Sequence, residues 1–96
     1  MPSFRVIVAV GMLGPGVAPE RVEPEAVAAG RELAVVEASN VDVVAGEARL
    51  TVRFTADHPR EALRVAEHVV QRIGTLASIG PWRLTERVGG RWYRRA

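Results

Sequence analysis

The segment from Ala48 to Ile73, ARLTVRFTADHPREALRVAEHVVQRI, constrains the fold more than any other part of this chain. In its first eight residues the apolar side chains Leu50, Val52 and Phe54 alternate with arginine and threonine. A period of two is typical of a strand that buries one face and leaves the other polar. The sequence therefore predicts a strand at 48–55.

A turn signal and a helical pattern follow this strand. Asp57 is a residue type that caps helix N-termini, and Pro59 suits a first helical turn. Gly74 is a natural C-terminal stop. Apolar residues recur between them at helical spacing, namely Ala62, Val65, Ala66, Val69, Val70 and Ile73. These features predict a helix at 58–73 with one buried face.

The first half of the chain supplies three further elements. Residues 4–11 are apolar on both faces, which is typical of a central strand. Acidic residues and prolines begin a helix expected at 20–38, although the run ELAVVEA within it also suits a strand. Ser39 and Asn40 are expected to end this helix, and VDVVA predicts a short strand at 41–45.

The loop between the first strand and the first helix, residues 11–19, is rich in glycine and proline. A phosphate-binding loop would lie at this position, but the glycine spacing does not match G-x-G-x-x-G. The position resembles that of the ligand loop in small-ligand regulatory domains of the ACT type, without their usual acidic and Pro-Gly pairing. A plain connector is favoured.

The C-terminal part predicts a hairpin. Residues 75–81 are expected to be irregular, and alternation then indicates a strand at 82–88. Gly89-Gly90 is a strong two-residue turn signal, because glycine accepts a positive φ at both central positions. RWYRR, residues 91–95, is expected to return as a short fifth strand.

The resulting order is β-α-β-β-α-β with an added C-terminal hairpin, within one α+β domain spanning 1–96. This order of elements resembles the ferredoxin-like fold, a two-layer sandwich. Right-handed crossovers would place the first and third strands side by side in the middle and both helices on one face. Many unrelated functions occur on such folds, so the resemblance says little about activity.

Composition excludes several kinds of chemistry. The chain has no cysteine, so disulfides and thiolate sites are excluded. It has no apolar run long enough for a transmembrane helix and no signal-peptide pattern, so we expect a cytoplasmic protein without membrane contact. The two histidines lie ten residues apart on one predicted helix, about 15 Å along its axis and too far to share a metal. No nucleophile motif or converging pair of acids is present, so neither a cofactor nor an enzymatic activity is expected.

Charge is distributed unevenly. All 13 basic residues are arginine, and the net charge is +2. Residues 1–50 carry four arginines and seven acidic residues, a net −3, whereas residues 51–96 carry nine and four, a net +5. The second half is therefore where an anionic partner would bind.

One face of the predicted sheet is the most suggestive surface. If Leu50, Val52, Phe54, Trp82 and Leu84 face the helices, the opposite side shows Arg5, Ile7, Ala9, Arg49, Thr51, Arg53, Thr55, Arg83, Thr85 and Arg87. An arginine-rich face with the C-terminal hairpin could bind RNA or DNA phosphates through Arg5, Arg53, Arg83, Arg87, Arg91, Arg94 and Arg95. RNA-binding sheets usually offer aromatic side chains for base stacking, and this face of the predicted strands offers none.

An alternative occupant of the same face is a second subunit. An apolar centre with a polar rim is typical of interfaces. Ile7 and Ala9 would form that centre, and Trp92 and Tyr93 of the hairpin would add contact area. The favoured hypothesis is thus a non-enzymatic homodimeric interaction module, formed through this face or by hairpin exchange. Nucleic-acid binding is the first alternative, and a small-ligand regulatory domain is the second.

Overall fold

The computed structural model describes residues 1–96 as two helices, one 3₁₀ turn and five strands. In chain order the elements are β1 Ser3–Leu13, η1 Pro19–Arg21, α1 Val22–Leu33, β2 Val36–Val44, β3 Glu47–Thr55, α2 Pro59–Gly74, β4 Ala77–Val88 and β5 Arg91–Arg94. No helix is long and apolar enough to cross a membrane.

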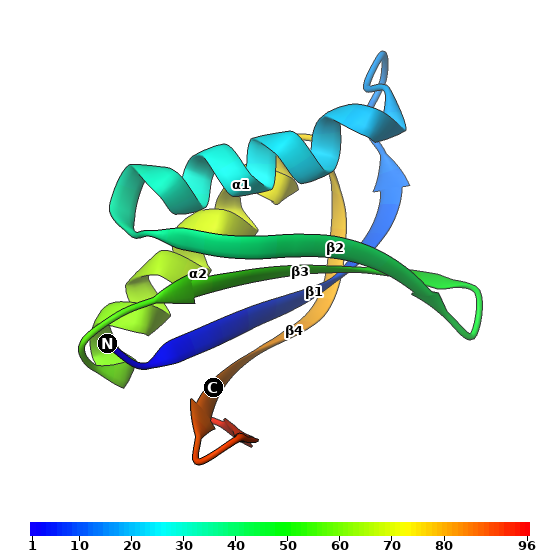
Figure 1. The fold of residues 1–96 in the computed structure, drawn as a ribbon. Coiled ribbons are helices and arrows are strands. Elements are labelled where there is room, and N and C mark those ends of the chain that lie inside the picture. The colour runs from blue at the N-terminus through cyan, green and yellow to red at the C-terminus, as the bar shows by residue number, and fades with distance from the viewer.

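The five strands form one antiparallel sheet in the order β2-β3-β1-β4-β5. The first and third strands are neighbours, as the sequence predicts. Both helices lie on one side of the sheet, and β5 extends it at the C-terminal end (Figure 1). The chain is therefore an α+β protein with a layer of helices on a layer of strands.

The core lies between these two layers. Leu50, Val52, Phe54 and Leu84 are buried on the helix side, as predicted from the alternation. The six apolar residues expected on the inner face of α2 are all buried. Trp82 is only half-buried and packs at the margin of the core. The strand alternation and the helical spacing of apolar residues therefore predicted the buried residues of β3 and α2 correctly.

The helix predicted at 20–38 is wrong at its C-terminal end. A 3₁₀ turn begins at Pro19, α1 ends at Leu33, and Ala34 is already extended. Residues 36–44 form β2 instead of a short strand at 41–45, and Ser39 and Asn40 lie inside it. The reason is tertiary, because β2 pairs with β3 over its whole length. Residue propensities alone are compatible with either a helix or a strand for ELAVVEA.

Two further predictions need correction. Residues 77–81 are not irregular, because β4 begins at Ala77 and pairs with the end of β1 across a bulge near Pro81. Bulges tolerate a proline, which lacks a backbone donor. The side chain of Asp57 does not cap α2, whose N-cap is His58 with no side-chain hydrogen bond.

Candidate functional site

The side of the sheet opposite the helices, called here the open face, gathers the polar residues of four strands. The strand register places Arg5 opposite Arg53 and Thr85, and Ile7 opposite Thr51 and Arg83. Cross-strand partners share one face of a sheet. The open face of β1, β3, β4 and β5 therefore carries Arg5, Ile7, Ala9, Arg49, Thr51, Arg53, Arg83, Thr85, Arg87, Trp92 and Arg94.

An aromatic side chain lies on this face, contrary to the prediction that it has none. Trp92 pairs with Arg87 across the hairpin, and this register directs its indole to the open face. The guanidinium carbon of Arg5 lies 3.9 Å from the indole centroid and that of Arg53 lies 5.3 Å from it. Both distances are within the range of cation–π attraction. The hairpin thus supplies the aromatic group that the longer strands lack.

The cations around Trp92 also repel one another. Arg5 and Arg53 face each other on neighbouring strands, an arrangement that is destabilising for like charges. Burial lowers the pKa of Arg5, and the charges of Arg53 and Arg87 lower it further. Glu37 offsets part of this repulsion, because its Oε1 accepts a hydrogen bond from Arg53 at 3.1 Å. The pKa of Glu37 is lowered by a hydrogen bond from Ser3 and by this contact.

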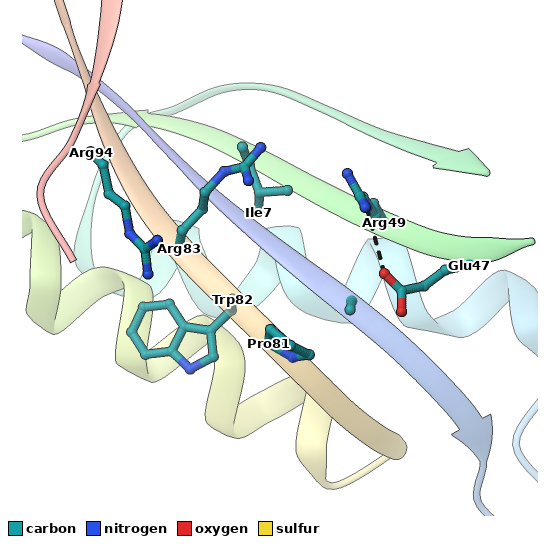
Figure 2. A pocket seen from close by; sticks show the side chains of 8 residues that line it. Ile7, Glu47, Arg49, Pro81, Trp82, Arg83 and Arg94 are labelled. Atoms are coloured by element: carbon teal, nitrogen blue, oxygen red, sulfur yellow. Dashed lines mark ion pairs between the residues drawn. The ribbon is translucent and has the colours of Figure 1, made fainter. Parts of the chain in front are cut away.

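A depression of about 190 Å³ lies on the same face, with Ile7 and Ala9 among the residues that line it. Arg83 from β4 and Arg94 from β5 reach toward it from one side, and Arg49 lies across β1, paired with Glu47 (Figure 2). Cations from three strands thus line one shallow depression that includes apolar side chains. Guanidinium groups are suited to binding phosphate groups.

A second depression of about 310 Å³ continues this surface toward β2. Arg5, Arg49 and Arg83 line it together with the polar β2 residues Asn40 and Asp42. Arginines common to both depressions make the two a continuous surface. The open face is therefore long enough to follow an extended ligand across several strands.

Most cations of the open face have no carboxylate partner. Arg49 and Arg53 form ion pairs with Glu47 and Glu37, respectively. Four others form no ion pair, namely Arg5, Arg83, Arg87 and Arg94. The hydroxyl oxygen of Thr85 is buried on the same face and has no hydrogen-bond partner. The four arginines without an ion pair therefore retain capacity for an anionic ligand.

The structure does not bring all predicted binding residues together. Arg95 forms an ion pair with Glu86 at 2.9 Å and lies over the ring of Tyr93. Glu86 and Tyr93 are cross-strand partners on the side of the hairpin opposite Trp92. Arg91 lies two residues before Tyr93 in the same strand and therefore shares its side. Arg91, Tyr93 and Arg95 are therefore separate from the open-face cluster, whereas Ile7 and Ala9 lie within it.

Arg49 and Thr85 belong to this site, although they are not among the binding residues predicted from the sequence. The alternation of their strands assigns both residues to this face, so a sequence signal for them exists. The position of Trp92 has no such local signal, because it depends on the register of the hairpin.

Other candidate residues have structural roles. The His68 ring nitrogen lies 2.7 Å from Glu32, so this histidine is not simply solvated as its position in the sequence suggests. The Ser39 hydroxyl donates to Glu23, and the Ser78 hydroxyl oxygen accepts from the backbone N–H of Met12. The Gly-rich loop is shorter than expected, since β1 continues to Leu13. None of these residues forms a converging catalytic set.

No family model, curated protein or solved structure matches this chain.

Proposed function

We propose that this protein binds single-stranded nucleic acid, RNA or DNA, across the open face. The observation that carries the proposal is an indole flanked by the guanidinium groups of Arg5 and Arg53, on a face that no helix covers. Four arginines of this face form no ion pair, namely Arg5, Arg83, Arg87 and Arg94. Arginines would contact phosphates, and Trp92 would stack on a base after releasing Arg5 or Arg53.

A single strand suits this surface better than a duplex. Binding of single strands combines a cationic groove with exposed aromatic faces. The open face carries Trp92, and the half-buried Trp82 also lines its depression (Figure 2). The centre of the face at Ile7 is apolar and suited to the faces and edges of unpaired bases. A duplex keeps its bases stacked and would leave Trp92 unused.

The homodimer expected from the sequence would use the same face and is disfavoured there on electrostatic grounds. A two-fold interface brings the same patch of both subunits together. The patch with the unpaired cations Arg5, Arg83, Arg87 and Arg94 would then face the same patch of the other subunit. Like charges in contact oppose association, so an anionic occupant fits better.

We also propose that the fold is ferredoxin-like. In support, β2-β3-β1-β4 form an antiparallel sheet with the second helix connecting β3 to β4, and β5 is an addition at the edge. This fold name describes architecture and adds no weight to nucleic-acid binding.

Fluorescence anisotropy with labelled single-stranded RNA and DNA of mixed sequence tests the function. Binding should weaken with salt, with a logarithmic slope of roughly −2 to −3 if three or four phosphates are contacted. Arg83→Glu and Arg94→Glu should each weaken it by about tenfold or more, the ~1.4 kcal/mol of one lost contact to a phosphate or base. Trp92→Ala should weaken it by a similar factor, and Trp92→Phe should restore part of the loss.

Arg64→Glu is the matched control. Arg64 is exposed on α2, in the helix layer, and forms no ion pair. Its replacement by glutamate changes the net charge by the same amount as Arg83→Glu. Its effect should be much smaller than that of Arg83→Glu. An absence of binding at low salt, or equal losses for the two variants, would refute the proposal.

A further inference from the structure

We propose that two copies of this chain associate edge to edge through β2 and form one continuous ten-stranded antiparallel sheet. This surface is separate from the open-face cluster. β2 ends the sheet on its side, so the outer edge of this nine-residue strand has no pairing partner. Unpaired strand edges are templates for another strand.

Beyond the bulge at Glu37, the edge lacks most of the features that usually prevent such pairing. Charged side chains such as lysine, prolines and bulges are typical protective devices. From Ser39 to Val44 there is no proline and no basic residue, the only charge is Asp42, and the register with β3 is regular. Val41 and Val43 are 48% and 74% exposed, respectively. The valine side chains of this part of the edge are therefore accessible to a second strand.

The turn between β2 and β3 fixes which backbone groups point outward. Ala45 and Gly46 form a two-residue turn with positive φ at both positions, so Val44 and Glu47 are the first hydrogen-bonded pair. Hydrogen-bonded pairs alternate along an antiparallel ladder. Asn40, Asp42 and Val44 thus bond to β3, and the N–H and C=O groups of Ser39, Val41 and Val43 point outward.

The sequence of β2 is self-complementary about Val41. A two-fold axis at this residue pairs Val41 with its own copy and Ser39 with Val43 of the other subunit, all through outward-pointing groups. On the open face it places Asn40 next to Asp42 of the other subunit. These two side chains already form a donor–acceptor pair within one chain, at 2.7 Å. An axis at Asp42 would instead oppose two like charges, which is unfavourable.

The helix side offers an apolar surface at the same place. A groove of about 520 Å³ has Val41, Val10, Leu13 and Val22 among its lining residues. The β2–β3 hairpin extends beyond α1, so the helix leaves its tip accessible (Figure 1). Val41 and Val43 of a second copy would extend the apolar wall of this groove and lose contact with water. Edge hydrogen bonding and apolar burial would thus act together.

The two-fold axis at Val41 is perpendicular to the sheet, and it therefore places the two open faces on the same side of the dimer. It keeps all helices on one side and both arginine clusters on the other. If the open face binds nucleic acid, the dimer would present two binding surfaces to one strand. The association itself does not depend on that function and is measurable without any ligand.

Light scattering and sedimentation over a micromolar concentration range test the association. The wild-type protein should approach twice its chain mass of 10.4 kDa. Val41→Lys would place two cations on the axis and should raise the dimer dissociation constant by about 100-fold or more, as expected for contacting like charges. Val88→Lys is the matched control, because Val88 is also 48% exposed and lies far from β2 in the sheet.

Amide hydrogen exchange supplies a second readout that depends on register. In a dilute sample, Ser39, Val41 and Val43 should exchange fast while Asn40, Asp42 and Val44 are protected by β3. At high concentration all six should be protected. A monomer at every concentration, an unchanged dimer in Val41→Lys, or an alternating exchange pattern that persists at high concentration would overturn the proposal.

Discussion

Gly30 illustrates how a single residue is explained only by its neighbours. In the sequence it weakens a predicted helix, because glycine costs about 1 kcal/mol relative to alanine in a helix interior. In the structure it is buried in α1, and a Cβ atom there would lie 2.9 Å from a methyl group of Val36. The glycine allows α1 to approach β2 closely.

Gly30→Ala should therefore destabilise the protein by roughly 1–3 kcal/mol, because overpacking exceeds the gain in helix propensity. Chemical denaturation monitored by circular dichroism measures this. Gly74→Ala is the control, since a Cβ atom at Gly74 meets nothing within 4 Å and the change should be neutral or stabilising. A gain in stability for Gly30→Ala would show that Val36 moves aside without cost.

At the scale of elements, one ion-pair network joins the two helices. Glu32 at the end of α1 accepts hydrogen bonds from Arg72 of α2 at 2.7 and 2.8 Å and contacts His68 at 2.7 Å. The hydrogen bond from Arg72 holds the pKa of Glu32 below its usual range, and that from His68 adds to the effect. The network is exposed, so it contributes modestly to stability.

The pH dependence of this contribution has a definite sign. A carboxylate whose pKa is lowered by folding adds stability above its unfolded pKa, and that stability is lost as the pH falls through the folded pKa. Glu32→Gln should lower the denaturation midpoint at neutral pH, and the difference from wild type should vanish in acid. Glu67→Gln, at an exposed residue of α2 without an ion pair, is the control. A difference that is the same at neutral and acidic pH would contradict the assignment.

Over the whole molecule, the open face concentrates positive charge that packing does not require. Arg83 and Arg87 are exposed and form no ion pair, and Arg87 is one of the cations that lower the pKa of Arg5. Natural proteins often accept unfavourable charge at sites that bind ligands. We therefore expect these arginines to contribute to binding more than to folding.

Replacing Arg83 and Arg87 together by glutamine should leave the free energy of unfolding within about 1 kcal/mol of wild type or raise it slightly. The same double variant should bind single-stranded nucleic acid more weakly. Arg60→Gln with Arg64→Gln makes the same change of net charge, from +2 to 0, on α2 and should leave binding nearly unchanged. Severe destabilisation by the open-face variant would mean that these arginines serve the fold.

The elements predicted most accurately from sequence are those whose periodicity coincides with burial. The strand expected at 48–55 is β3, and the helix expected at 58–73 is α2, each within one residue at either end. Gly89-Gly90 forms the predicted turn with positive φ at both residues. In these segments the local pattern and the tertiary environment favour the same structure, so the pattern alone is sufficient.

Tertiary structure decided the elements and contacts that local pattern leaves ambiguous. β2 is an edge strand without a buried residue, so burial marks its extent poorly in the sequence and pairing with β3 defines it. The placement of Trp92 over Arg5, and of Arg95 beside Glu86, follows from the register of a hairpin and not from composition. Periodicity reports which side of a segment is buried, whereas long-range pairing determines which residues of different strands meet. The open-face cluster is a product of that pairing.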